Sequence, residues 1–147
     1  MTQRRSVLAG LIGATVCGQG FAQEAERSPK AWIEHLTQSQ PVHEGRVELT
    51  LPRLADNGLA VPLKVHVNSP MTDADHVLQI CVVSMRNPRP LMARYFLGPH
   101  AGRAELATRV RLNGTQEVVV LAQMSDLSWW SARAEVEVTE SACLDAS

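Results

Sequence analysis

Apolar and polar residues alternate with a period of two along most of this chain. In the run 61–67 the odd-numbered positions are Val, Leu, Val and Val, and the even-numbered positions are Pro, Lys and His. A β-strand points successive side chains to opposite faces, so this pattern predicts strands with one buried face and one solvated face. The same alternation recurs at 47–51, 106–112 and 132–139. The chain is therefore expected to build its core from β-sheets.

Turn signals lie between these runs. Asp56-Asn57-Gly58 stands between 47–51 and 61–67, and Asn113-Gly114 precedes the apolar segment 117–124. Asn and Gly tolerate a positive φ, which tight hairpin turns require. The first signal therefore predicts a hairpin between its two flanking runs.

Two more strands are expected in the middle of the chain. The segment 77–84 is nearly all apolar, which is typical of a strand covered on both faces. Asn87-Pro88-Arg89-Pro90 then breaks the chain before a further strand at 91–97. Around seven short strands with turns at this spacing predict an all-β fold, an immunoglobulin-like antiparallel β-sandwich.

A short helix is expected before the first strand. Ser28 can cap its N-terminus, and Pro29 suits the first helical position. Trp32 and Leu36 would lie on its apolar side, and the helix is expected to end before Pro41.

The N-terminus has the pattern of an export signal. Arg4-Arg5 precede an apolar run at 7–16, which is too short to span a membrane as a helix. Gly20-Phe21-Ala22 supplies small residues at the two positions that a signal peptidase reads. We therefore expect a signal peptide over residues 1–22, of the twin-arginine type, that directs the protein to the periplasm.

This segment allows two other interpretations. An ordinary secretory signal is the alternative, because Val7 stands where the twin-arginine motif prefers an aromatic residue. A lipoprotein anchor on Cys17 is disfavoured, because Val16 is bulkier than the residue usually found before a lipidated cysteine. Both the favoured interpretation and the ordinary signal imply export.

The remaining chain has the size and charge of one exported domain. Residues 23–139 are expected to form a single domain with an N-terminal helix, followed by a C-terminal arm at 140–147. The formal net charge of the sequence is −1, and no basic cluster stands out after the signal. Nucleic acid and an anionic membrane are therefore not expected as partners.

No motif for a cofactor or for catalysis stands out. The sequence lacks a phosphate-binding glycine loop and the glycine pattern of a nucleophile elbow. The five histidines have no metal-ligand spacing: His35, His43, His66, His76 and His100. We expect no cofactor and no metal. The missing motifs disfavour an ordinary enzyme, and a Ser-His-Asp or Cys-His arrangement stays open, because such residues meet only in the fold.

Two neighbouring tryptophans, Trp129 and Trp130, follow a turn-like segment. On a strand they must point to opposite faces, so at most one is expected in the core. The other is expected to be partly exposed, either as an interface residue or as an edge residue that covers a loop.

Two cysteines remain once the signal is removed. Cys81 lies inside the apolar segment 77–84 and is expected to be an inert core thiol. Cys143 lies four residues from the end, where core packing is not expected. It is either half of a disulfide with Cys81 or an accessible thiol on a tether. The tethered thiol is favoured, because a disulfide would require the tail to fold back onto a buried strand.

Several further motifs lie in order along residues 31–143: Asp56-Asn57-Gly58, Val61-Pro62, Asn68-Ser69-Pro70-Met71-Thr72, Asn87-Pro88-Arg89-Pro90, Thr108-Arg109-Val110-Arg111-Leu112, Leu121-Ala122-Gln123-Met124-Ser125-Asp126 and the terminal Cys143. Together these motifs resemble those of the SoxY family.

This resemblance implies the sulfur carrier subunit of the periplasmic Sox system for thiosulfate oxidation. Members of the family have an immunoglobulin-like fold, form a heterodimer with SoxZ and hold sulfur intermediates on an arm cysteine, here Cys143. The heme enzyme SoxXA couples thiosulfate to that thiol, SoxB releases sulfate by hydrolysis, and SoxCD oxidises the remaining sulfane in some organisms. The carrier itself catalyses nothing.

The end of this chain departs from the family pattern Gly-Gly-Cys-Gly-Gly. Ser141-Ala142 precede the cysteine and residues 144–147 follow it, so the arm is bulkier and less flexible. Asp145 and the chain carboxylate are expected to disfavour the thiolate by like-charge repulsion.

Two alternatives to the carrier remain open. One is a non-enzymatic immunoglobulin-like binding or structural subunit with a Cys81–Cys143 disulfide. The other is a small thiol enzyme with a histidine base.

Overall fold

The computed structural model describes residues 27–140, so the predicted signal peptide and Cys143 lie outside the described residues. The elements follow in chain order: α1 (Pro29–Thr37), β1 (Val42–Glu44), β2 (Val47–Thr50), β3 (Leu54–Asn57), β4 (Val61–Val67), β5 (Val77–Ser84), β6 (Leu91–Phe96), the 3-10 turn η1 (Pro99–Ala101), β7 (Glu105–Val110), β8 (Gln116–Met124) and β9 (Trp129–Glu140).

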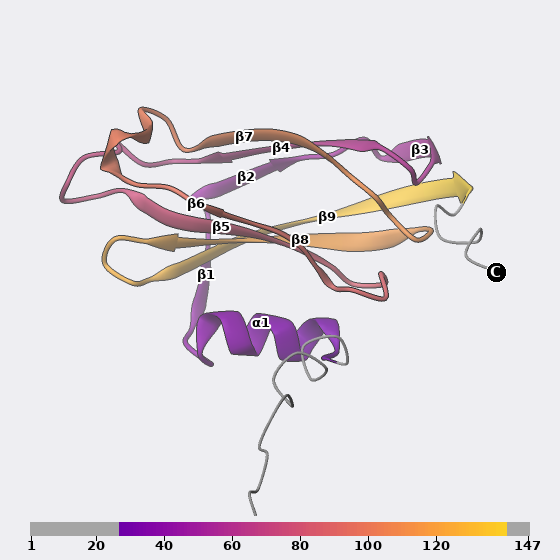
Figure 1. Ribbon diagram of the computed structural model, residues 1–147, viewed down its shortest axis with the longest axis horizontal. Helices are drawn as coiled ribbons and strands as arrows, with labels where there is room; N and C mark the ends of the chain where they lie inside the picture. Colours follow the sequence, from indigo (N-terminus) through magenta and orange to yellow (C-terminus); the bar gives the residue numbers. More distant parts are fainter. Residues whose placement is uncertain (1–26, 141–147) are drawn as a thin grey trace, which may run out of the picture.

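Two β-sheets pack face to face, and α1 covers the outer side of the larger sheet (Figure 1). The larger sheet has the order β1-β9-β8-β5-β6, with β3 also paired to β9, and the smaller sheet has the order β2-β4-β7. The pairings are antiparallel except for β1 and β3, which run parallel to β9. The predicted β-sandwich is confirmed, with two short strands beyond the seven expected.

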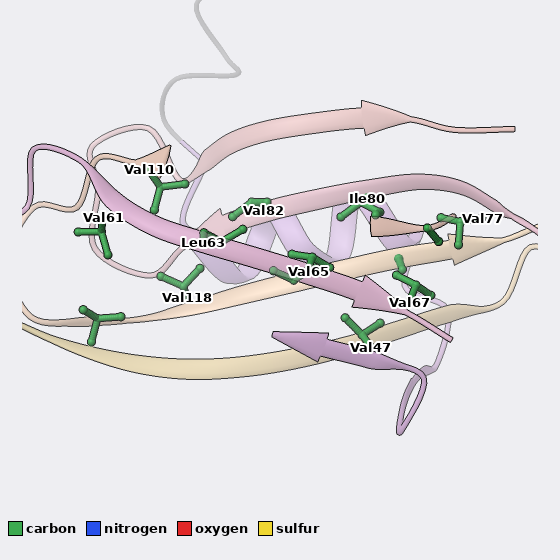
Figure 2. Close-up of a cluster of buried hydrophobic side chains, with 14 of the residues drawn as sticks. Val47, Val61, Leu63, Val65, Val67, Val77, Ile80, Val82, Val110 and Val118 are labelled. Atoms are coloured by element: carbon green, nitrogen blue, oxygen red, sulfur yellow. The ribbon is translucent and has the colours of Figure 1, made fainter. Parts of the chain in front are cut away.

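The main core lies between the two sheets. Every odd-numbered residue of β4 is buried and every even-numbered residue is exposed, as the alternation in 61–67 predicts. Figure 2 shows the β4 side chains among those of β5 and β8, including Ile80, Val82 and Val118. Removing these branched apolar side chains from water is the main stabilising contribution to the sandwich.

A second cluster lies between the larger sheet and α1. Trp32 and Leu36 from the helix pack on Cys81 and Val83 of β5. The predicted cap is confirmed, since the Ser28 side chain accepts a hydrogen bond from the Ala31 amide at 3.2 Å. Strand β5 is therefore covered on both faces, as its apolar composition predicts.

The two runs on either side of Asp56-Asn57-Gly58 pair antiparallel as β2 and β4, as predicted, but no tight turn joins them. The segment between them contains β3, which pairs with the end of β9. Asn57 accepts a hydrogen bond from the Leu59 amide through its side-chain oxygen, at 3.1 Å. The turn residues thus connect two sheets, because the partner of β3 lies 83 residues further along the chain, at the end of β9.

Strand β9 begins at Trp129, before the expected start at 132, and continues to Glu140. Its first three residues pair with β1 and its last residues pair with β3. Between residues 27 and 140, no helix has the length and apolar character needed to span a membrane.

Candidate functional site

The candidate site is the end of β9, from which residues 141–147 continue. The proposed site residue, Cys143, lies outside the described residues, so the structure supplies the three residues before the tail and their surroundings. These are Val138, Thr139 and Glu140 of β9.

Strand β3 holds one edge of this strand end. Leu54, Ala55 and Asn57 align in parallel with Glu137, Val138 and Glu140. The Thr139 hydroxyl donates to the Asp56 carbonyl, and the Gly58 amide donates to the Glu140 carbonyl at 3.0 Å. Backbone pairing therefore continues to the last described residue.

Thr115 holds the opposite edge. Strand β8 pairs with β9 only as far as Gln116, which aligns with Val136. Beyond that point the Val138 amide donates to the Thr115 hydroxyl at 2.9 Å, and the same hydroxyl lies 3.4 Å from the Val138 carbonyl oxygen. One side chain thus takes the place of a further residue of strand pairing.

A polar network fixes the loop that carries Thr115. The Asn87 side chain donates to the Arg111 carbonyl at 2.7 Å and accepts from the Asn113 amide at 2.8 Å and from Gln116 Nε2 at 3.1 Å. The Arg86 guanidinium donates to the Thr115 carbonyl at 3.3 Å. The motif Asn87-Pro88-Arg89-Pro90 and the turn Asn113-Gly114 therefore meet at the end of the sandwich where β9 ends.

A groove of about 790 Å³ lies beside residues 134–137 of β9. Leu49 and Leu51 contribute its apolar lining, and Arg53, Glu135 and Glu137 contribute charge. Among the described residues, its lining contains no cysteine, serine or histidine, so it offers no nucleophile with a histidine base of the kind that hydrolases use.

Cys81 is fully buried, as predicted. Burial raises the pKa of its thiol to about 11, while the positive charge of Arg94 lowers this pKa by a smaller amount. A thiol that stays protonated at neutral pH is a poor nucleophile, because the thiolate is the reactive form. Cys81 therefore acts as a core side chain.

Chain geometry prevents a disulfide between Cys81 and Cys143 while β9 keeps its pairing. Across the sheet, Cys81 aligns with Leu121, which aligns with Ser131. Ser131 and Glu140 are nine positions apart, or about 30 Å of strand. The three residues from Glu140 to Cys143 extend at most about 11 Å, and a disulfide needs Cα atoms within about 7 Å.

The five histidines are distributed over separate parts of the fold. His66 Nδ1 lies 3.5 Å from Glu105, the His43 ring lies 5.2 Å from the Trp130 ring, and His76 Nδ1 lies 2.9 Å from the Thr72 carbonyl oxygen. Within residues 27–140, no group of three His, Cys, Asp or Glu side chains is placed to hold a metal ion.

Trp129 and Trp130 point to opposite faces, as predicted. Trp129 is buried in the cluster under α1, whereas Trp130 is partly exposed and packs against the main core. The Trp130 ring lies against His43 and 5.6 Å from the Arg46 guanidinium, and its indole nitrogen donates to the Ser128 hydroxyl at 3.0 Å.

Sequence reasoning did not find the two hydrogen-bonded edges of the β9 end. The β3 segment, Leu-Ala-Asp-Asn, is too short and too polar to show a period of two, and Thr115 follows a turn signal that does not indicate which strand its side chain contacts. The turn signals beside both segments were the only local indication.

Comparison with known proteins identifies the chain's relatives. The family model described as "Sulfur oxidation protein SoxY" matches residues 33–143. The sulfur carrier protein SoxY from Chlorobium limicola f thiosulfatophilum has a similar structure, with a TM-score of 0.63 and 25% identity, over 80% of this chain and 98% of that chain. A search of curated protein sequences gave no match.

Superoxide reductases share the fold. The enzyme from Ignicoccus hospitalis (neelaredoxin) has a TM-score of 0.57 at 15% identity, over 82% of this chain and 99% of that chain. A putative superoxide reductase from Thermotoga maritima has a TM-score of 0.55 at 20% identity, over 67% of this chain and 87% of that chain. At these identities the similarity concerns the fold alone.

Proposed function

The chain belongs to the SoxY family of sulfur oxidation proteins, and on this premise we propose that it carries sulfur intermediates covalently on the thiol of Cys143. In this proposal the signal peptide at 1–22 takes the chain to the periplasm by the twin-arginine route. A SoxZ-like subunit pairs with the sandwich, and the chain catalyses no step itself. Enzymes similar to SoxXA, SoxB and SoxCD bind the carrier transiently.

The anchored end of β9 is the observation that carries the proposal. The strand is hydrogen-bonded on both edges close to Glu140, three residues before Cys143. The Cα of Cys143 can therefore lie no further than about 11 Å from the Glu140 Cα. A short tether with a fixed root keeps the effective concentration of the thiol high at a docked partner's active site.

The burial of Cys81 supports Cys143 as the attachment point. After removal of the predicted signal these are the two cysteines of the chain, and Cys81 is fully buried under α1. Because its thiol is protonated at neutral pH and shielded from solvent, sulfur chemistry at Cys81 would require local unfolding.

The carrier chemistry is a sequence of steps on one thiol. In the first step, the Cys143 thiol and thiosulfate form a sulfur–sulfur bond, and a proton and two electrons leave to an oxidising haem partner. Hydrolysis of the resulting thiosulfonate adds water, releases sulfate and leaves a persulfide on Cys143. Other thiolates and nucleophiles can attack such sulfur–sulfur bonds and exchange with them.

The residues around Cys143 set a requirement for the partner enzymes. Ala142 and Leu144 stand where the family pattern has glycine, so a partner channel must accommodate their side chains. We expect the double variant Ala142→Gly/Leu144→Gly to be used at least as well as the natural chain by Sox enzymes whose own carriers have glycine at both positions. The measurement is the rate of sulfate release with each carrier.

Intact-mass spectrometry of the protein isolated from thiosulfate-grown cells tests the proposal. We expect sulfane or thiosulfonate adducts on the natural chain and on Cys81→Ala, and none on Cys143→Ser. The Cys81→Ala variant is the matched control, because it removes a thiol without touching the arm. Adducts that persist in Cys143→Ser would contradict the assignment.

The competing function is a binding or structural subunit with a Cys81–Cys143 disulfide. The reach of residues 141–143 argues against it, since the tail would have to displace part of β9. A mass deficit of two protons that a reductant removes, without sulfur adducts, would favour this alternative and sink the carrier proposal.

A further inference from the structure

A pocket of about 380 Å³ opens on the outer face of the larger sheet, beside the C-terminal end of α1. Its lining comes from the helix end and from four strands: His35, Leu36, Gln38, Gln79, Arg94, Gln123 and Trp129. Strand register brings its strand residues together, since β5 aligns Gln79 with Gln123 of β8 and aligns the nearby Cys81 with Arg94 of β6.

A relay of hydrogen bonds orients the polar groups of this pocket. Arg94 Nε lies 2.6 Å from Gln79 Oε1, and Gln79 Nε2 lies 2.6 Å from Gln123 Oε1. A guanidinium can only donate, so Gln79 Oε1 must accept and Gln79 Nε2 must donate to Gln123. The nitrogens of Gln123 and Arg94 that take no part in these two bonds are Gln123 Nε2 and the two terminal nitrogens of Arg94, and all three are donors.

Gln79 makes this arrangement rigid. Gln79 is only 7% exposed. Its side-chain oxygen and nitrogen each form one of the two hydrogen bonds of the relay. The Arg94 guanidinium carbon also lies 4.9 Å from the centre of the Phe96 ring, and this cation–π contact is at the surface, since both residues are exposed. The donors are thus positioned before any ligand arrives.

The charge of the pocket selects an anion. No Asp or Glu belongs to its lining, and among residues 27–140 Arg94 forms no ion pair. His35 adds a further ring nitrogen, while Leu36 and Trp129 provide apolar walls. A guanidinium with two free nitrogens is the group that binds planar and tetrahedral oxyanions in a bidentate manner.

We propose that this pocket is a binding site for a small inorganic oxyanion of the sulfate type, held by the terminal nitrogens of Arg94 and the side-chain amide of Gln123. The site is separate from the Cys143 arm and does not depend on the carrier role. An oxyanion bound there would bridge β6 and β8 across β5 and stabilise the folded state by mass action.

Isothermal titration of the full chain with sodium sulfate, at an ionic strength held constant with sodium chloride, tests the site. We expect saturable binding that weakens at least about tenfold in Arg94→Gln, because the bidentate contact is lost. The matched control is Arg109→Gln, which removes one exposed positive charge from β7 on the other sheet and should change the affinity less than about twofold.

A second measurement keeps the proposal testable if Arg94→Gln folds poorly. In the natural chain, sulfate should shift the side-chain amide NMR signals of Gln79 and Gln123 and the indole signal of Trp129, with acetate as a planar anion for comparison. Absence of saturable binding, equal weakening in both variants, or shifts centred elsewhere would overturn the proposal.

Discussion

Burial decides the chemistry of Cys81. The side chain lies between β5 and α1 at 0% exposure, and burial outweighs the opposing charge of Arg94 in setting its pKa near 11. The buried, protonated thiol of Cys81 therefore does not react as a nucleophile, whereas an accessible cysteine of the same chain can. A sulfur carrier with a second, accessible thiol could lose its cargo by exchange.

The raised pKa of Cys81 predicts a pH dependence of stability. In the unfolded chain the thiol ionises near pH 9, whereas in the folded protein it stays protonated to about pH 11. Between these values the folded state binds more protons, so the free energy of unfolding falls as pH rises. We expect a loss of about 2–3 kcal/mol across this window, measured by urea unfolding at a series of pH values.

The variant Cys81→Ala provides the control for this prediction. It lacks the thiol but retains every other group that titrates above pH 9. Its stability should fall less than that of the natural chain over the same window. Parallel curves for the two proteins would show that Cys81 does not cause the effect.

At the scale of elements, the Thr115 side chain forms the hydrogen bonds that a further residue of β8 would form with the end of β9. Thr115 is the last residue of the β7–β8 loop. Its hydroxyl bonds to the backbone of Val138, which lies beyond the last residue of β9 that pairs with β8. Without it, the last residues before the tail would be paired on one edge only.

The substitution Thr115→Val should loosen this strand end. It keeps the side-chain volume but leaves the Val138 amide without its partner, at a cost of about 1–2 kcal/mol. We expect amide hydrogen exchange at Val138 to accelerate about tenfold while the central residues of β8 change less. Thr108→Val on β7 is the matched control, and equal acceleration at Val138 in both variants would contradict the role of Thr115.

The turn between β8 and β9 contains a strained residue. Leu127 has a φ of +69° and is 57% exposed, so its side chain is in the left-handed region without compensating burial. Asn adopts this region at lower cost than Leu. We expect Leu127→Asn to raise the free energy of unfolding by about 0.5–1 kcal/mol, measured by urea unfolding. Leu59→Asn, at another exposed leucine, should bring no comparable gain.

At the scale of the whole molecule, α1 forms a third layer over the larger sheet (Figure 1). Its buried side chains complete the cluster that contains Cys81, Leu121 and Trp129. The helix therefore protects the outer face of β5, which the smaller sheet cannot reach.

Truncating Trp32 should destabilise this layer. We expect Trp32→Ala to cost about 3–5 kcal/mol, because Trp32 is only 8% exposed and fills the space under the helix. Alkylation of Cys81 by iodoacetamide should also accelerate. Trp32→Phe retains most of the apolar volume, and its cost should stay under about 1.5 kcal/mol. Unchanged alkylation in Trp32→Ala would show that α1 does not shield the thiol.

The sequence alone determined the sheet-forming segments with a clear pattern. The alternation in 61–67 predicts the buried face of β4, and the apolar composition of 77–84 predicts that β5 is covered on both faces. Ser28-Pro29 predicts the start of α1. These features are local, because the side-chain direction in a strand and the capping of a helix depend on neighbouring residues. The burial of Cys81 follows from the same local pattern.

The tertiary structure decided everything that depends on pairing between distant residues. Strand β3 exists because β9 offers an edge to it, so the Asn57-Gly58 signal could not show that the chain changes sheets there. Strand register alone brings Gln79, Arg94 and Gln123 together, and the length of β9 places its anchored end far from Cys81. Register joins residues that are far apart in sequence, which no local pattern encodes.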